Sequence, residues 1–473
     1  MRRRLTAAAL AVLALLVLPA AAPAAPPTQA LRAGAARMPM RVPPGTPLAG
    51  YGSLRRRALV PDLLGLHPHA FWFKPGEGHL DEVAVRALVV YAGETRVTWI
   101  AADLIAVDQA FVARLNARLA ASGIRAGALI VSASHTHSGP GAFLDSALFG
   151  VVAVDREDAM VRDAILDAMI EAVRRAGARA RDAQIAVATV EAPPVTRSRL
   201  DGGVDRDVVV VRLTTTDGEP IAVLWNYAIH GTMLGPRNRK LSGDVMGVAS
   251  RALEASLGVP ALFVNGAVGD VSPRHHGAQE QEATGRTLAA AVRRGWDAAE
   301  APDSLRGRSV GGLGGAPRAP HVVVRSARVR LPPPAVSLRH CAARWIPGAV
   351  RVPVGSALPQ DTEMIAGALG PVAWLTMPGE PITALGQEIK DTARKRWPHA
   401  FVASVSNDYL GYFVRPQDYA SSGYVTCAAL YGPQIGPCLV ETGVTLLDSL
   451  TRDGPRLRAA ARAPASCDEV AAR

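Results

Sequence analysis

Apolar residues recur along this chain with two periods, and the two alternate over most of its length. Short apolar runs bounded by glycine, proline or charged residues predict β-strands. The predicted strands cover residues 83–91, 96–105, 128–131, 184–190, 208–213, 221–228, 261–264, 372–376 and 401–405. Helical spacing predicts helices over residues 110–121, 155–176, 245–257, 279–299 and 381–395, and a last helix from near Val440. This mixture predicts a layered α/β or α+β fold, with mixed sheets packed against long helices.

Two stretches show neither period. Residues 25–47 are rich in proline and alanine, and we expect a loosely ordered lead-in there. Residues 301–340 contain a glycine-rich run and consecutive prolines, which is typical of a linker or a lid. Since no internal repeat is visible, we expect one catalytic domain over residues 48–455, followed by a C-terminal tail over 456–473.

The first residues have the pattern of a secretory signal. Three arginines at 2–4 precede an apolar run from Ala7 to Leu18, and small residues follow at Ala20–Ala24. This order predicts a signal peptide over residues 1–24 and a secreted or periplasmic protein. No other stretch approaches the roughly 18 apolar residues of a membrane-spanning helix, so none is expected in the mature protein.

The composition of the chain indicates which kinds of binding partner to expect. The chain has 473 residues, of which 49% are hydrophobic, and a formal net charge of +11. Nearly all the positive charge is arginine scattered along the sequence, without the basic block of a nucleic-acid-binding protein. We therefore expect no nucleic-acid partner, while attraction to an anionic membrane surface stays compatible with this charge.

The four cysteines are Cys341, Cys427, Cys438 and Cys467. An even number in an exported chain favours disulfides. A Cys427–Cys438 bond would close a short loop, and a Cys341–Cys467 bond would fasten the C-terminal tail. Three pairings exist and the sequence does not choose among them. A cysteine metal site is disfavoured because no Cys-x-x-Cys motif occurs.

Three histidines follow predicted strands. His135 and His137 are two positions apart, so in extended chain their imidazoles lie on one face. His230 ends another apolar strand, and a zinc site would need such a further ligand. Taken singly, the pair also suits a polar loop, and His230 suits a hydrogen-bonded core position. Asp244 could orient a metal-binding histidine through a hydrogen bond, or it could cap the following helix.

A serine, a carboxylate and several phenols complete the candidate chemistry. Ser272 lies on a glycine-rich turn that exposes side chains and backbone N–H groups, although a plain turn serine is the commoner case. The neighbouring His275 and His276 are expected on the surface. Glu380 joins a strand to a helix, where it could simply complement the helix N-terminus. The C-terminal tyrosines, which an aromatic loop would also explain, are Tyr409, Tyr412, Tyr419, Tyr424 and Tyr431.

Taken together, these motifs resemble the neutral, non-lysosomal ceramidase family. The matching strings are Thr136–Gly141, Ala228–His230, Gly269–Pro273, Pro378–Glu380 and Tyr431–Pro433. They occur in the family's order and with similar local spacing, across roughly residues 45 to 450. Members of that family are zinc amidohydrolases that cleave the N-acyl bond of ceramide to a sphingoid base and a fatty acid.

The resemblance implies a ligand set for zinc. By matching position the ligands are His135, His230, Glu380 and Tyr412. The tyrosine is chosen because the segment from Asn407 to Tyr412 matches the family's segment up to its ligand tyrosine. Imidazole, carboxylate and phenol ligands are compatible with zinc.

The resemblance also implies the roles of four further side chains. Ser272 corresponds to the nucleophile and Tyr424 to the oxyanion donor that follows the ligand tyrosine. His137 corresponds to a residue that assists substrate binding or proton transfer, and Arg197 to one that contacts the polar part of the substrate. Zinc would lower the pKa of a bound water, and hydrogen-bond donors would stabilise the tetrahedral oxyanion.

The implied function is an exported zinc-dependent amidohydrolase acting on ceramide-like lipids, with the substrate met at a membrane surface. Because the chain ends soon after its last predicted helix, we expect a short form without the family's C-terminal immunoglobulin-like domain. The span from Ser272 to Glu380 is shorter than in well-known members, which motivates two alternatives. The same zinc and serine site could act on another N-acyl amide or ester, or the protein could be a non-catalytic zinc- or lipid-binding envelope protein.

Overall fold

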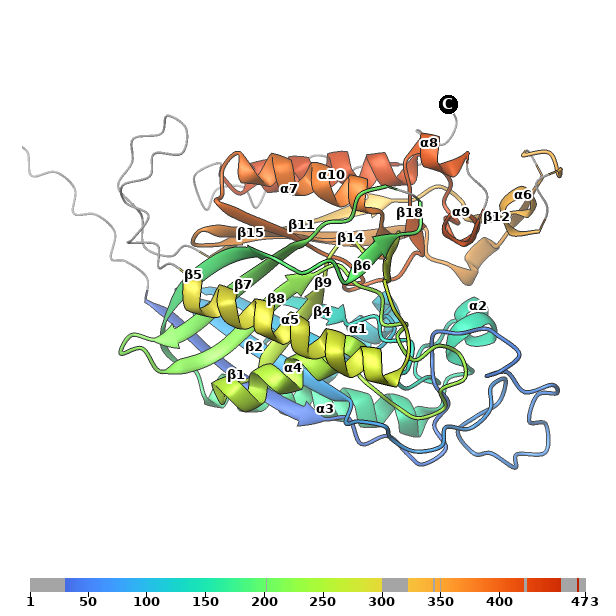
Figure 1. Cartoon of the computed structure of the whole chain (residues 1–473), viewed down its shortest axis with the longest axis horizontal. Helices are drawn as coiled ribbons and strands as arrows, with labels where there is room; N and C mark the ends of the chain where they lie inside the picture. Colours follow the sequence, from blue (N-terminus) through green and yellow to red (C-terminus); the bar gives the residue numbers. More distant parts are fainter. Residues whose placement is uncertain are drawn as a thin grey trace, which may run out of the picture.

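Four layers stack in the order helices, sheet, sheet, helices (Figure 1). The computed structural model describes residues 30–200, 202–299, 322–342, 345–348, 350–420, 423–451 and 466–467. The predicted layered α/β fold, with mixed sheets packed against long helices, is confirmed. In the described part of the chain, no helix is both long and apolar enough to cross a membrane.

The larger sheet has eight strands among the described residues. In chain order they are β1 (Leu31–Pro39), β2 (Ala84–Ala92), β3 (Thr95–Ala102), β4 (Ala128–Ala133), β5 (Arg181–Glu191), β7 (Asp207–Thr215), β8 (Pro220–Tyr227) and β9 (Ala261–Asn265). Their order across the sheet is β4-β3-β2-β1-β5-β7-β8-β9.

The second sheet and three small ones lie further along the chain. The second sheet has the order β11 (Val322–Arg330), β14 (Asp361–Leu369), β15 (Val372–Thr376) and β17 (His399–Ala403). The two-stranded sheets pair β6 (Thr196–Ser198) with β10 (Val271–Pro273), β12 (Ala335–Ser337) with β13 (Arg351–Pro353), and β16 (Glu380–Pro381) with β18 (Tyr412–Phe413).

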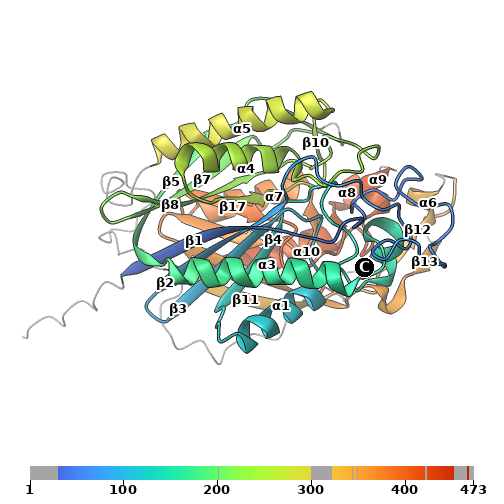
Figure 2. The same ribbon diagram turned by 90° about the horizontal axis from the view of Figure 1, so that it is seen from below.

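Long helices cover the outer faces of both sheets. The helices are α1 (Gln109–Ala121), α2 (Ala147–Phe149), α3 (Ala159–Ala178), α4 (Asp244–Leu257), α5 (Ala278–Ala298), α6 (Leu338–Cys341), α7 (Thr383–Arg394), α8 (Pro416–Tyr419), α9 (Tyr424–Cys427) and α10 (Ile435–Ser449). The described residues also form a π-helical turn, η1 (Gly150–Val154), and a 3₁₀ turn, η3 (Gly355–Ala357). Helices α1, α3, α4 and α5 cover the larger sheet (Figure 2), and α7 and α10 cover the second.

Unbroken apolar runs in the strands explain why both faces of the larger sheet are buried. In β7, Val209 and Val211 point into the core between the two sheets, whereas Val208 and Val210 point into the core under α4 and α5. Successive strand side chains face opposite sides, so an unbroken valine run supplies both cores. Trp99 of the larger sheet contributes to the inter-sheet core together with aromatic residues of the second sheet.

Parallel strand pairs bring several strand ends to one edge. Strands β3 and β4, β8 and β9, and β15 and β17 run parallel, while the other pairs within the two sheets are antiparallel. A bridge between Thr136 and Gly231 joins the segments that follow β4 and β8. Residues just beyond these strands therefore meet at the edge where α/β sheets usually hold their ligands.

The expected loosely ordered lead-in over residues 25–47 was wrong for residues 31–39. They form β1, which lies inside the larger sheet between β2 and β5. The small residues that suggested a loop have a packing role, because a Cβ added at Gly34 would lie 2.2 Å from the carbonyl oxygen of Ala176 in α3. Small side chains in β1 let the helix approach the sheet closely.

The expected linker or lid over residues 301–340 was also wrong in part. Residues 322–330 form β11, which pairs with β14 along its full length. Residues 300–321 lie outside the described part of the chain, as do the predicted signal peptide and most of the predicted C-terminal tail.

The disulfides are Cys341–Cys427 and Cys438–Cys467, so neither pair suggested from the sequence forms. Helix α10 carries Cys438 away from Cys427 and towards the tail, where Ser466 bridges to Arg330. Helix α9 packs on α6, which places Cys427 beside Cys341. The pairing depends on contacts between elements that no sequence spacing records.

Candidate active site

Two histidines at the sheet edge are held by backbone carbonyls. Nδ1 of His135 lies 2.8 Å from the carbonyl oxygen of Ile105, and Nδ1 of His230 lies 2.8 Å from that of Val271. A carbonyl only accepts hydrogen bonds, so each Nδ1 carries a proton. His135 has a φ of 66°, an uncommon conformation of a kind that clusters at functional sites.

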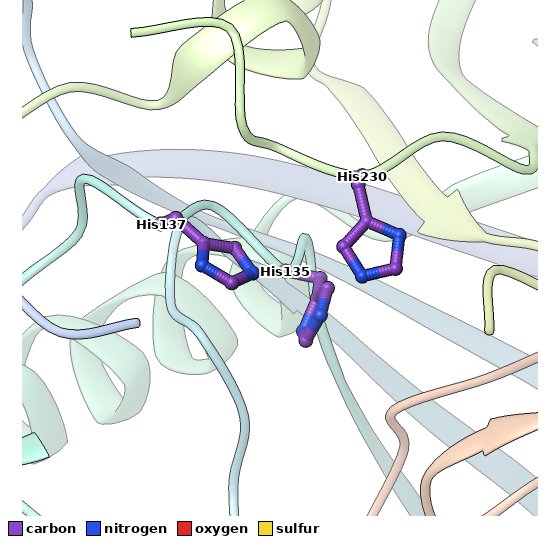
Figure 3. A group of neighbouring side chains, drawn as sticks. All are labelled: His135, His137 and His230. Atoms are coloured by element: carbon purple, nitrogen blue, oxygen red, sulfur yellow. The ribbon is translucent and has the colours of Figure 1, made fainter. Parts of the chain in front are cut away.

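A third histidine converges on the same point (Figure 3). Ligand nitrogens of His135, His137 and His230 lie within 4.8 Å of one another, and all three residues are buried. Both ring nitrogens of His137 lack a hydrogen-bond partner among the described residues. The sequence prediction that these histidines share one site agrees with this geometry.

Glu380 lies between two of these imidazoles. Its carboxylate oxygens are 3.2 Å from Nε2 of His135 and 3.0 Å from Nε2 of His230. The hydroxyl of Tyr409 donates a hydrogen bond of 2.5 Å to the same carboxylate. Strand β16 pairs with β18 so that Glu380 lies opposite Tyr412, whose hydroxyl is 3.2 Å from Nε2 of His230.

The protonation states of these groups suit them to bind a cation. Burial tends to raise the pKa of Glu380, but attraction to His135 and His230 outweighs it and holds that pKa well below its usual range. Burial is the main cause that lowers the pKa of His230 to about 4, and it also lowers that of His137 strongly. At neutral pH the carboxylate is therefore ionised and both of these imidazoles are neutral.

The donor set fits a metal ion. Nε2 of neutral His230 lies 3.0 Å from one oxygen of Glu380, and a cation bound by both groups would hold this nitrogen and oxygen together. Nε2 of His135 and one oxygen of Glu380 are among the buried atoms without a hydrogen-bond partner in the described chain. Such buried groups are rare unless an ion or water satisfies them, and buried nitrogen and oxygen donors suit zinc.

Ser272 is buried in β10 beside these residues. Its Oγ accepts a 2.6 Å hydrogen bond from Nε of Arg199, whose Nη1 donates to the Tyr412 hydroxyl at 3.3 Å. One guanidinium thus connects the predicted nucleophile to a predicted metal ligand. Tyr424 begins α9 and is 67% exposed, with its ring centroid 5.7 Å from that of Tyr412. It therefore borders the site from the solvent side.

Arg197 differs from its expected place. Strand pairing sets it opposite Ser272, but its side chain is exposed, and Arg199 makes the contacts at the site instead. The sequence reasoning missed Arg199, although residues two apart in a strand share a face and Thr196–Arg199 offered both arginines. It also missed Tyr409 as the partner of Glu380.

Other candidates lie off the site. Asp244 does not hold a histidine; its carboxylate accepts from the backbone N–H of Val245 at the start of α4. Among the described residues, carbonyls of Ile105 and Val271 hold the two Nδ1 atoms instead. His275 and His276 are exposed, as predicted.

Parts of the chain are similar in sequence to neutral ceramidases. Residues 69–293 match the family described as neutral/alkaline non-lysosomal ceramidase, N-terminal. The chain is 26% identical over 210 residues to a neutral ceramidase of Pseudomonas aeruginosa, covering 40% of this chain and 31% of that protein. It is 27% identical over 173 residues to neutral ceramidase B of Dictyostelium discoideum, covering 32% of this chain and 24% of that protein. The alignments thus span about a quarter to a third of these relatives' length.

The fold agrees with solved structures. A crystal structure of the neutral ceramidase from Pseudomonas aeruginosa superposes with a TM-score of 0.72 at 19% identity, covering 89% of this chain and 74% of that chain. A structure described as ceramidase complexed with C2 gives a TM-score of 0.73 at 18% identity, covering 89% and 75%. Residues 69–293 thus match the N-terminal part of the neutral/alkaline non-lysosomal ceramidase family, and the chain shares the fold of the solved ceramidase structures.

Proposed function

We propose that this protein is an exported zinc-dependent amidohydrolase that cleaves the N-acyl bond of ceramide-like lipids. The observation that carries the proposal is the convergence of buried donors on one point beside a buried serine. In this proposal His135, His230, Glu380 and Tyr412 hold the metal, which stands near Ser272. Two disulfides support a protein that matures outside the reducing cytosol.

Bound zinc would supply Lewis-acid polarisation and a lowered pKa for water. The chain's own groups would do the rest. Oγ of Ser272 attacks the amide carbonyl carbon, the C–N bond breaks, and the amine leaves with a proton while the acyl group stays on Ser272. Neutral His137, whose two ring nitrogens have no hydrogen-bond partner among the described residues, would exchange that proton. Tyr424 donates to the oxyanion, and water then releases the fatty acid from Ser272.

Release of fatty acid from ceramide by the purified mature protein tests this proposal, with metal content measured on the same sample. We expect turnover together with one zinc per chain, and loss of turnover on chelation that returns with added zinc. A protein that holds one zinc yet releases no acid from ceramide or any other acyl amide would instead be the non-catalytic binding protein. Turnover that survives complete removal of the metal would overturn the zinc assignment.

An exposed apolar loop beside the site supports the proposal that the protein binds its substrate at a membrane surface. Tyr51, at the start of this loop, packs on His137 with ring centroids 4.8 Å apart. The exposed side chains that follow, each between 68% and 90% exposed, are Leu54, Leu59, Val60, Leu63, Leu64 and Leu66. This blue segment and α9 lie at the same end of the molecule in both views (Figures 1 and 2).

Replacing Leu63 and Leu64 together with serine should weaken binding to vesicles that contain an anionic phospholipid by at least about 10-fold. Each leucine contributes on the order of 1 kcal/mol when it is partly withdrawn from water. Exposed Arg55 in the same loop would add attraction to the anionic headgroups. Co-sedimentation measures the binding. Hydrolysis of a soluble short-chain ceramide should be unchanged, and unaltered vesicle binding would contradict the assignment of this loop.

A further inference from the structure

Arg199 brings a positive charge to the predicted nucleophile without bringing a carboxylate partner. Nε and Nη1 donate to the hydroxyls of Ser272 and Tyr412. Among the residues that the structure describes, no aspartate or glutamate forms an ion pair with Arg199, and Nη2 has no hydrogen-bond acceptor. The side chain is half-buried. Nη2 is therefore open to a further acceptor, and a carboxylate is an acceptor that a guanidinium binds strongly.

The planar guanidinium is a recognition group for carboxylates, which it binds through parallel hydrogen bonds. The head of ceramide is neutral and carries hydroxyl groups, so its recognition does not need a full positive charge. Arg197 lies two positions earlier in the same segment and is exposed, so the half-buried charge is specific to position 199.

Resting on the function proposed above, we infer that the preferred substrate is an N-acyl α-amino acid, whose carboxylate Arg199 binds. In such a molecule the carbon that bears the scissile nitrogen also bears the carboxylate. Ceramide bears a hydroxymethyl group at that same carbon. A carboxylate at this position would lie close to the amide carbonyl that Ser272 attacks, which is where the guanidinium is located.

The reaction is the same amide hydrolysis with a different leaving amine. Ser272 Oγ forms a bond to the acyl carbon, the C–N bond breaks, and the amino acid leaves after its nitrogen receives a proton. One water then cleaves the acyl–serine ester, which yields a fatty acid and restores Ser272. The sum is an N-acyl amino acid plus water giving a fatty acid and an amino acid, so no further reactant is needed.

A matched pair of substrates tests the inference on the zinc-loaded protein. N-dodecanoylglycine and N-dodecanoylethanolamine differ only in a carboxylate against a hydroxymethyl group. We expect the wild type to favour the glycine conjugate in kcat/KM by at least about 10-fold, since hydrogen bonds to charged groups contribute roughly 1.5–3 kcal/mol. Arg199→Gln should remove this preference, mainly through a higher KM, and Arg199→Lys should retain part of it.

Arg197→Gln is the matched control, because it removes the same charge from the same segment at an exposed position. It should leave the ratio of the two substrates unchanged. A wild type that prefers the ethanolamine conjugate overturns the inference. So does an Arg199→Gln variant that loses kcat equally on both substrates, since that pattern marks oxyanion stabilisation instead. Turnover of ceramide without turnover of the glycine conjugate rejects the amino-acid substrate but keeps the proposed function, whereas turnover of neither removes both.

Discussion

Replacing Ser272 with alanine should lower fatty-acid release from ceramide by at least about 10³-fold. Loss of a serine nucleophile in hydrolases that use one costs up to about 10⁶-fold in kcat. Ser272 follows Val271, whose carbonyl holds His230, and its Oγ is already oriented by a 2.6 Å hydrogen bond from Arg199. Alanine removes Oγ and no other atom, so the measured loss reports on the nucleophile. Initial rates at saturating substrate give the value.

Two controls make the serine result interpretable. Zinc content should stay at one per chain in Ser272→Ala, because Ser272 is not among the proposed ligands. Ser122→Ala, a change at an exposed helix end, should leave turnover unchanged. A Ser272→Ala protein that keeps most of its turnover would mean that water attacks the amide directly and that no acyl-serine forms.

Much of the fold could be predicted because burial leaves a periodic trace. The valine run of β7 predicts a strand buried on both faces, and the apolar spacing within α3 and α5 predicts helices that cover a sheet. Strand β1 escaped prediction because its small residues serve a tertiary contact, the close approach of α3 at Gly34, rather than a local preference. Local patterns report which face is buried, but they do not report what lies against it.

The candidate site could also be predicted only in part, because some of its residues follow a local pattern and others depend on tertiary packing. His135, His230 and Glu380 each follow a strand, so a rule about strand ends was enough to place them together. Arg199 could not be chosen over Arg197, because the choice depends on the twist of a short strand pair and on which side chain turns inwards. The disulfide pairing could not be predicted for the same reason. It depends on the packing of α9 against α6 and on the position of the tail near α10.

The ligand set itself has two readings that one substitution separates. The set expected from the family resemblance includes Glu380, whereas His135, His137 and His230 alone also form a compact group of nitrogens. Glu380 is the ionised group among them, and its charge would contribute strongly to holding a divalent ion. If the first set is correct, removing this charge should cost more metal affinity than removing His137.

Glu380→Gln should therefore weaken zinc binding by at least about 100-fold, while His137→Ala should change it by less than about 10-fold. Loss even of groups that only support metal ligands costs roughly 10- to 100-fold, and a direct ligand should cost more. Titration against a competing chelator gives the affinities, and Glu363→Gln, an exposed position on β14, controls for loss of one carboxylate charge. The opposite order, with His137→Ala the more damaging change, would assign the metal to the three histidines. Glu380 would then orient the histidines without binding the metal. The hydrogen bond from Tyr409 would hold Glu380 in that position.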